Sequence, residues 1–523
     1  MCGIFYVNDP HQQDTELVNK SFYKIKHRGP DVSKLLQLKT GVFMGFHRLQ
    51  INGLTAASNQ PMTFDDETYL LCNGEIYNHE ALQEKYNITC STGSDCEIIL
   101  HLYEKIGFTQ TVKELDGEFA IILVTPHVVY AARDPYGVRA LYMATGCQKI
   151  GLASENKALY ELFNPLDIRQ FLPGHICEWT LNDGGYNVYP YYELYQHATD
   201  VSIKNDKVCI NKLRELLIQA VQKRLMCSRR KDASMPAIGA YLSGGFDSSA
   251  IAAILQKELA GQLETFSIGF EGSPDLIYAR QVAIHIGSKH HEYIITEEQA
   301  LKAIPEVVRM IESYDITTVR ASTMMYLLSA YVRKETNIVV MLSGEGSDEA
   351  SGSYRYFHNA PNTKEFQLET ERLLKDLCYF DNLRADKTSA AWGLEIRVPF
   401  LDLDFLKYYM AVPPEMKTQY EMEKYLLRQA VSDYLPYEVL YRPKEAMSDG
   451  VSLHARSWAT IIQEHAAKLY SMLSGLEAEK YYYLALFKYH YKGCQQQIPY
   501  YWLPKWCGDI KDPSARVLSI YKA

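Results

Sequence analysis

The first part of the chain carries short apolar runs that end at turns or polar clusters. Runs of this kind, rich in β-branched and aromatic residues, predict strands at 2–7, 69–72, 119–124 and 128–132. Residues 95–106 instead repeat apolar positions at helical spacing, and Asp95 at their start is suited to cap that helix. The pattern therefore predicts a sheet-rich unit with a few helices.

After a polar stretch near residues 194–206, strands and helices alternate. The apolar runs predict strands at 238–242, 265–270, 293–295 and 338–342, and helices at 212–224, 250–259 and 275–286. This alternation implies a parallel sheet with helices on both faces, and ligands of such sheets bind at the carboxyl ends of the strands. We therefore expect two domains, residues 1–195 and 205–523.

Composition narrows the class of protein. The 523 residues carry a net charge of −9 without a dense basic stripe, which argues against nucleic-acid binding. No apolar run approaches the ~18–20 residues that span a membrane. The eleven cysteines show no CxxC pairs, a pattern that fits free thiols in a reducing compartment. We expect a cytoplasmic protein that binds neither nucleic acid nor membranes.

Cys2 is the first candidate for chemistry. Removal of Met1 would leave a thiol and a free α-amine on one residue. The unperturbed pKa values are about 8 for the amine and about 8.5 for the thiol, so the amine can act as a base for the nucleophile near neutral pH. Because any residue can follow Met1, position 2 alone decides nothing.

The loop at 243–249 follows a predicted strand and reads SGGFDSS. Its two glycines let the backbone approach a phosphate, and the helix after it directs free N–H groups at the anion. Ser243 and Ser248 add hydroxyls, and Asp247 can hold a magnesium ion. A plain glycine-rich turn between strand and helix is the alternative.

The loop at 343–349 reads SGEGSDE and follows another predicted strand, so it is expected at the same sheet edge. Glu345, Asp348 and Glu349 would repel one another and any phosphate unless a metal or cations lie between them. Lys444 could supply positive charge from the other side. A surface acidic turn and an exposed lysine are the alternatives.

Distinctive short motifs are spread over nearly the whole chain. They are CGI at 2–4, HRGPD at 27–31, NGEIYN at 73–78, TGSD at 92–95, SGGFDSS at 243–249, SGEGSDE at 343–349, EIRVPFLD at 395–402 and the segment 444–450. Taken together, these motifs resemble those of the glutamine-hydrolysing asparagine synthetases. Their joint presence in one order makes the resemblance specific. Ser351 and Ser353 depart from it, because they replace the usual Phe and Gly after the acidic loop.

The resemblance implies an N-terminal-nucleophile hydrolase domain, an αββα sandwich, followed by a parallel-sheet α/β ATP-pyrophosphatase domain of the PP-loop type. Cys2 would attack the side-chain amide of glutamine and release ammonia. Asn73 and Gly74 would form the oxyanion hole, whose donors stabilise charge that appears in the transition state. By the same resemblance, the glutamine ligands are Arg48, Asn73, Gly74, Glu75 and Asp95.

The second domain would join ammonia to aspartate through β-aspartyl-AMP, releasing AMP and diphosphate. Glu345 would assist formation of this intermediate and accept a proton as ammonia attacks. Lys444 would neutralise charge on the phosphates during adenylation. Asp247 and Asp348 would bind Mg²⁺, and Thr317 and Arg320 would line the aspartate pocket. The ATP ligands implied are Tyr241, Ser243, Gly244, Gly245, Asp247, Ser248, Ile268, Ser343 and Gly344.

Two alternatives stay open at this stage. A related PP-loop amide or β-lactam-type synthetase would act on a different carboxylate, but such relatives often lose Cys2, which this chain keeps with Arg48, Asn73 and Asp95. A non-catalytic glutamine or nucleotide sensor would have lost Cys2 or the acidic loop. The substrates expected are therefore aspartate, glutamine and ATP, and the family suggests a homodimer.

Overall fold

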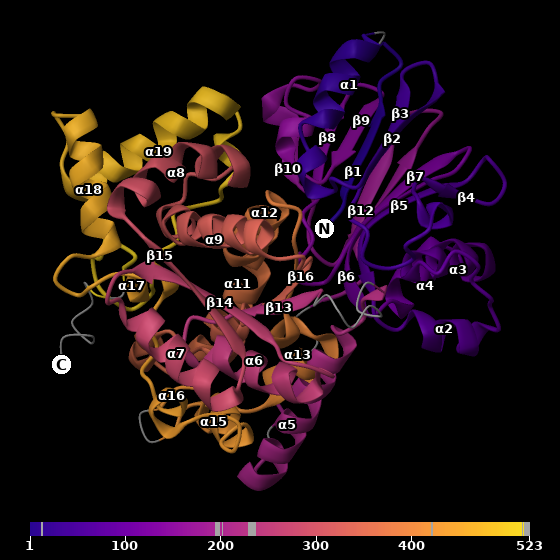
Figure 1. Ribbon diagram of the computed structural model, residues 1–523. Coiled ribbons are helices and arrows are strands. Elements are labelled where there is room, and N and C mark those ends of the chain that lie inside the picture. The colour runs from indigo at the N-terminus through magenta and orange to yellow at the C-terminus, as the bar shows by residue number, and fades with distance from the viewer. Residues whose placement is uncertain are drawn as a thin grey trace.

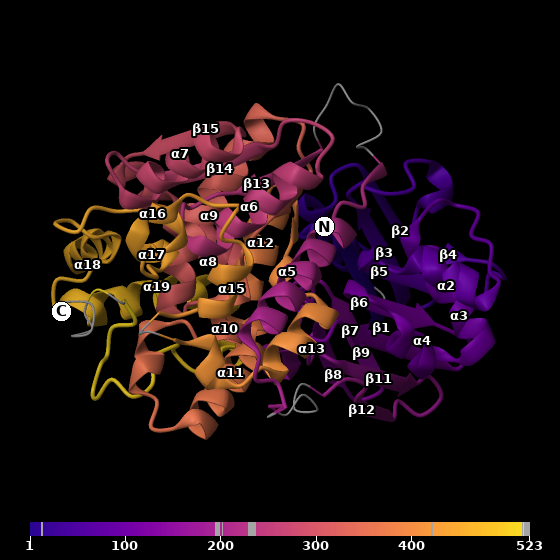
Figure 2. The same cartoon turned by 90° about the horizontal axis from the view of Figure 1, so that it is seen from below.

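The computed structural model describes residues 1–11, 14–193, 199–200, 202–228, 237–419, 422–514 and 516. A sheet-rich unit, which holds the N-terminus, lies beside a larger unit of helices around a third sheet (Figures 1 and 2). The expected domain boundary between 195 and 205 falls partly outside the described residues.

Two six-stranded antiparallel sheets build the first unit. Sheet A has the order β10-β8-β9-β1-β3-β2, and sheet B has the order β12-β11-β7-β6-β5-β4. Ile4 and Met44 of sheet A pack with Leu71 and Ile122 of sheet B in a core between the sheets. The strands are β1 Gly3–Asn8, β2 Val32–Lys39, β3 Val42–Arg48, β4 Met62–Thr63, β5 Tyr69–Ile76, β6 Gly117–Val124, β7 Val128–Arg133, β8 Tyr142–Gly146, β9 Lys149–Ala153, β10 Ile168–Gln170, β11 His175–Thr180 and β12 Tyr186–Pro190.

Helices cover the outer faces of both sheets. Phe22 of α1 packs with Phe5 against sheet A, and Leu102 of α3 packs with Phe119 against sheet B. The αββα sandwich implied by the resemblance is therefore confirmed. The helices are α1 Thr15–Tyr23, α2 His79–Tyr86, α3 Ile98–Ile106 and α4 Phe108–Glu114.

The prediction that Asp95 caps the helix is wrong. A 3₁₀ turn, η3 Asp95–Glu97, precedes α3, and the Ser94 side chain caps it by accepting from the N–H of Cys96. Asp95 instead accepts the N–H of Ile76, which lies in β5, at 2.8 Å. Its carboxylate is thus directed toward the strand that carries the candidate oxyanion hole.

Sheet C, five-stranded and parallel throughout, has the order β15-β14-β13-β16-β17. Strand order reverses at β13, so the loops that follow β13 and β16 open into one crevice. Both loops are those that the sequence analysis selected. The strands are β13 Ile238–Tyr241, β14 Glu264–Phe270, β15 Lys289–Ile295, β16 Val340–Leu342 and β17 Glu395–Arg397.

Helices lie on both faces of sheet C, as the alternation predicted. Figure 1 shows α8 and α9 on one side of the sheet and α6 and α7 on the other, and two apolar cores fill these layers. The helices are α5 Asp206–Lys223, α6 Phe246–Glu258, α7 Pro274–Ile286, α8 Glu297–Ile311, α9 Ile316–Glu335, α10 Ser347–Ser351, α11 Thr363–Asp376, α12 Asp381–Ala390, α13 Leu403–Ala411, α14 Pro414–Lys417, α15 Tyr425–Ala430, α16 Tyr437–Leu440, α17 Met447–Gly450, α18 Trp458–Leu469 and α19 Gly475–Tyr491.

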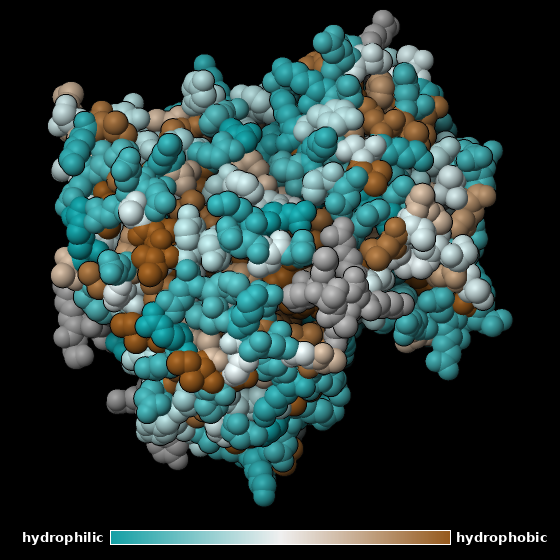
Figure 3. All heavy atoms as spheres, viewed as in Figure 1, coloured by the Kyte–Doolittle hydropathy of each residue, from teal (hydrophilic) through white to brown (hydrophobic). Residues whose placement is uncertain are grey.

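The face shown in Figure 3 is mainly hydrophilic, with hydrophobic residues in separate small groups. Within the described residues, no helix combines the length and the apolar character that a membrane span requires.

Buried ion pairs join the two units. Arg28 donates through Nη1 to Glu155 in its own unit and to Asp386 of α12 in the other, both at 2.8 Å. All three side chains are at most 1% exposed. Removing one partner of such a group leaves a charge in a site with little water, which destabilises the fold.

We expect Arg28→Met to lower the free energy of unfolding by about 3–5 kcal/mol, because Asp386 would stay buried without its guanidinium. Urea titration followed by tryptophan fluorescence measures the loss. Arg456→Met is the control, since the ion pair of Arg456 with Glu297 is half-exposed on both sides. Equal losses in the two variants would contradict a special role for the buried pair.

Candidate functional site

Cys2 precedes β1 and lies against β5. Its backbone N–H donates to Oδ1 of Asn73 at 2.8 Å, and its Sγ accepts the N–H of Leu49 at 3.4 Å. With Met1 attached, burial raises the pKa of the Cys2 thiol to about 11 and lowers that of the Met1 amine to about 6. The thiolate is the nucleophilic form, and burial of the unprocessed end disfavours it.

Asn73 and Gly74 are the residues predicted to form an oxyanion hole. Oδ1 of Asn73 is occupied by Cys2, whereas its buried Nδ2 has no hydrogen-bond partner among the described residues. That donor is free to bind an oxygen next to the thiol. At Gly74 a Cβ atom would lie 2.1 Å from the carbonyl oxygen of Glu118, so only glycine fits there.

Glu75 and Asp95 are buried carboxyl groups on neighbouring segments. Burial raises the pKa of both, and the charge of Asp95 raises that of Glu75 further. Nη2 of Arg397, 3.3 Å from Oε1 of Glu75, offsets part of this repulsion. A bound ammonium group would offset more of it. The pair therefore suits the α-amine of an amino acid.

Arg48 is buried and already bonded to the loop beside it. Nη1 donates to the carbonyl of Thr55 at 2.9 Å and to Oδ1 of Asn59 at 2.6 Å, and Nη2 donates to the carbonyls of Asn52 and Gly53. A substrate carboxylate at Arg48 would have to replace some of these acceptors.

A cavity at the carboxyl end of sheet C brings nearly all the other predicted residues together. Gly244 differs. Its φ is +71°, and a Cβ there would lie 2.4 Å from the backbone nitrogen of Ala279, so Gly244 packs against α7. The predicted residues that line the cavity are Tyr241, Ser243, Gly245, Asp247, Ser248, Ile268, Thr317, Arg320, Ser343, Gly344, Glu345, Asp348 and Lys444.

Two serines of the glycine loop accept hydrogen bonds from the loop's own backbone. The N–H of Ser243 donates to Oγ of Ser248 at 3.1 Å, and the N–H of Gly245 donates to Oγ of Ser243 at 3.3 Å. Helix α6 begins at Phe246 without a side-chain cap. Its first N–H groups are therefore available to an anion such as a phosphate.

Asp247 and Asp348 share two ammonium groups. Nζ of Lys424 donates to one oxygen of each at 2.6 Å, while Nζ of Lys444 contacts Asp348 and lies 3.8 Å from Asp247. Burial opposes the ionisation of Asp348, yet these lysines hold its pKa well below the usual range. Two converging carboxylates are the donors that Mg²⁺ prefers, so the residues fit this ion.

Glu345 faces the cavity beside a buried guanidinium. Nη2 of Arg384 donates to its Oε2 at 2.6 Å and also contacts Asp381 at 2.8 Å. Burial nevertheless raises the pKa of Glu345 above its ordinary value. A carboxylate with a raised pKa is better suited to take up a proton near neutral pH.

The two predicted aspartate ligands differ in their availability. Oγ1 of Thr317 is buried without a hydrogen-bond partner among the described residues. The guanidinium of Arg320, in contrast, makes paired hydrogen bonds of 2.6–3.0 Å to Glu479 and Asp512. Arg320 therefore anchors the C-terminal segment at the cavity wall, with four of its five N–H donors already used.

Three residues of this cavity region were missed from the sequence. Lys424 and Arg384 pair with the predicted carboxylates, and Oγ of Ser353 donates to Oδ1 of Asp348 at 2.6 Å. An isolated lysine and an arginine in a charged helix carry no sequence signal. Ser353 was noticed as a departure from the family, but its contact with Asp348 depends on the turn after α10.

Comparisons with known proteins agree with this arrangement. The family model described as asparagine synthase matches residues 212–370 and 359–508, and the one described as glutamine amidotransferase domain matches residues 1–172. Asparagine synthetase [glutamine-hydrolyzing] of Gallus gallus is 43% identical over 572 aligned residues, covering 100% of this chain and 99% of that protein. The Homo sapiens protein of the same name is 43% identical over 547 residues, 96% of each chain.

Both family models thus lie on the units that carry the two sites, and the relatives align with the chain from end to end. The chain belongs to the glutamine-hydrolysing asparagine synthetases.

Proposed function

We propose that the protein converts ATP, L-aspartate, L-glutamine and water into AMP, diphosphate, L-asparagine and L-glutamate through β-aspartyl-AMP. One observation carries the proposal. One chain carries both a thiol with a free amide donor beside it and a cavity suited to phosphates, in which carboxylates pair with lysines. Family membership supports the same reaction.

In the first domain, Cys2 attacks the side-chain amide carbon of glutamine. Nδ2 of Asn73 and the N–H of Gly74 bind the oxyanion, and Glu75 and Asp95 bind the α-amine. Ammonia leaves, and water then hydrolyses the thioester to glutamate. Arg48 binds the glutamine carboxylate, which replaces some of the loop carbonyls that now accept its hydrogen bonds.

In the second domain, the side-chain carboxylate of aspartate attacks the α-phosphorus of ATP, and diphosphate leaves. Ser243, Gly245 and Ser248 bind the departing phosphates, and Lys444 balances their charge. Ammonia then attacks the activated carbonyl carbon, AMP leaves, and Glu345 accepts the proton. Thr317 is the stronger candidate for the aspartate pocket because its hydroxyl is unused.

Mg²⁺ is the proposed cofactor, held by Asp247 and Asp348, and when bound it supplies positive charge next to the phosphates. Residues 1–195 are proposed as the glutaminase domain and 205–523 as the synthetase domain. A cytoplasmic location and a homodimer stay predictions. We propose aspartate as the acceptor, and not another carboxylate, because the named relatives match over 96–99% of their length.

The decisive test is incubation with ATP, Mg²⁺, glutamine and a panel of carboxylic amino acids. Among the amino acids of the panel, we expect only aspartate to give AMP and an amidated product. Formation of ADP in place of AMP, or aspartate left unchanged with every nitrogen source, would contradict the proposal.

Cys2→Ala should abolish glutamine-dependent synthesis and keep ammonia-dependent synthesis, because the cavity of sheet C does not use the thiol. Asparagine and glutamate are measured with each nitrogen source in turn. Cys147→Ser, at an exposed free cysteine, is the matched control. Loss of both activities in Cys2→Ala would reject this division of work.

Active protein should begin at Cys2. With Met1 attached, the Cys2 nitrogen is a peptide N–H and cannot act as a base, and burial keeps the thiol protonated. Intact mass spectrometry of active enzyme is the measurement. A fully retained Met1 together with full glutaminase activity would refute the use of the α-amine.

Arg384→Gln should move the acid limb of ammonia-dependent synthesis to higher pH. The guanidinium lowers the pKa of Glu345, so its loss raises that pKa, and the deprotonated form needed to accept a proton appears about 1–3 pH units higher. Asparagine formation from ammonia is followed across pH. The glutaminase profile of the same variant is the internal control, and an unshifted synthesis profile would exclude Glu345 as the titrating group.

A further inference from the structure

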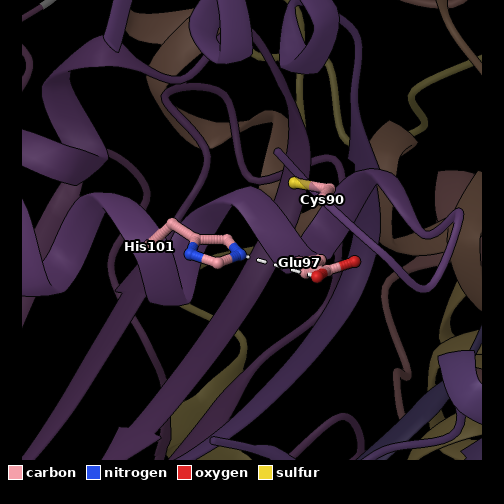
Figure 4. A group of neighbouring side chains, drawn as sticks. All are labelled: Cys90, Glu97 and His101. Carbon is pink, nitrogen blue, oxygen red and sulfur yellow. Dashed lines mark ion pairs between the residues drawn. The ribbon is translucent and has the colours of Figure 1, made fainter. Parts of the chain in front are cut away.

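Cys90, Glu97 and His101 form a compact group that the proposed reaction does not use (Figure 4). One sulfur, one carboxylate oxygen and one imidazole nitrogen lie within 4.8 Å of one another. Glu97 ends η3 and His101 lies four residues later on α3, a spacing that places two side chains on one helix face. Cys90 comes from the loop before η3.

The contact between His101 and Glu97 is too long for a good hydrogen bond. Nε2 of His101 lies 3.5 Å from Oε1 of Glu97, is buried, and has no hydrogen-bond partner among the described residues. Hydrogen bonds between nitrogen and oxygen measure about 2.7–3.2 Å. Two ligands about 2.0–2.1 Å from one tetrahedral zinc ion lie about 3.3–3.5 Å apart. The observed separation therefore matches two ligands of a shared cation.

The donor set also selects the kind of ion. Thiolate, imidazole and carboxylate together are typical of Zn²⁺, whereas Mg²⁺ and Ca²⁺ take oxygen ligands. Without a metal, burial and the charge of Glu97 raise the pKa of Cys90 to about 12. A bound dication favours the thiolate and reverses this effect.

Glu97 already organises the loop that holds Cys90. Its oxygens accept the backbone N–H groups and hydroxyls of Ser91 and Thr92 at 2.6–3.1 Å. These four donors occupy the lone pairs of the carboxylate, so zinc would have to displace one of them, such as the Ser91 hydroxyl on Oε1. The sulfur would also have to move closer to reach a Zn–S distance of about 2.3 Å.

We propose that Cys90, Glu97 and His101 bind one Zn²⁺ ion, with water as the fourth ligand, and that the ion fastens the loop 88–94 to α3. This loop leads directly into Asp95, and its Thr92 carbonyl accepts the hydroxyl of Ser58 at 2.7 Å. An effect of zinc on glutamine affinity would rest on the proposed function, whereas zinc binding itself does not.

The test uses the full-length protein, stripped with a chelator and dialysed against Zn²⁺. Zinc per chain is measured by mass spectrometry of the metal, and affinity by competition with a chromogenic chelator. Co²⁺ is substituted in parallel, because a thiolate ligand adds a charge-transfer band to a tetrahedral cobalt spectrum. We expect one tightly bound zinc per chain and that band.

Cys90→Ser and His101→Asn should each weaken zinc binding by more than the about 10–100-fold caused by losing a hydrogen-bond partner of a ligand. Cys147→Ser is the matched control and should bind zinc like the unaltered chain. Absence of bound zinc, unchanged affinity in Cys90→Ser, or a cobalt spectrum without the thiolate band would each overturn the site. The cobalt spectrum of the unaltered chain decides even if a variant fails to fold. None of these outcomes bears on asparagine synthesis.

Discussion

The relative position of the two domains depends on guanidinium groups buried against carboxylates. Glu118 of β6 accepts a hydrogen bond from Nη2 of Arg139 at 3.0 Å. It accepts a second, at 2.9 Å, from Nε of Arg224 in the other domain. These side chains are at most 3% exposed, so separating them would leave charges without water or partners. A hydrophobic interface could slide, but a charged pair at hydrogen-bond distance fixes both position and angle. The interface thereby fixes the position of the thiol relative to the cavity.

Arg397 shows how this constraint reaches both sites. It lies in β17, next to the strand that ends in the acidic loop, and its guanidinium contacts Glu395 at 2.8 Å and Glu75 at 3.3 Å. Glu75 follows the glycine of the candidate oxyanion hole. One side chain of the synthetase sheet therefore touches a proposed glutamine ligand. Loss of its charge would raise the pKa of Glu75 further and favour a neutral carboxyl group where the substrate amine is expected.

Local pattern was enough to predict four of the sandwich strands (β1, β5, β6 and β7), sheet C up to β16 and the two Ser-Gly loops, because each combines an apolar run with a turn signal. It failed where tertiary contacts override the pattern. β17 was missed because its charged residues Glu395 and Arg397 are typical of exposed positions. Ion pairs across the interface, to Arg139 and Glu75, accompany their burial. Asp95 was given a cap role that Ser94 fills. Lys424 could not be found, since its approach to Asp247 is created only by the chain's return from a distant segment.

The cavity charges explain why the two lysines, the predicted Lys444 and the missed Lys424, are needed. Asp247 and Asp348 carry two negative charges, and Lys424 and Lys444 carry two positive ones, so the group is balanced before any phosphate arrives. Without the lysines, the carboxylates would repel each other in a buried site and one would take up a proton. A protonated carboxyl is a poor ligand for a cation. By holding the pKa of Asp348 low, the lysines preserve a donor pair with Asp247 that would hold a magnesium ion, and both lysines lie close enough to the cavity to bind phosphates there.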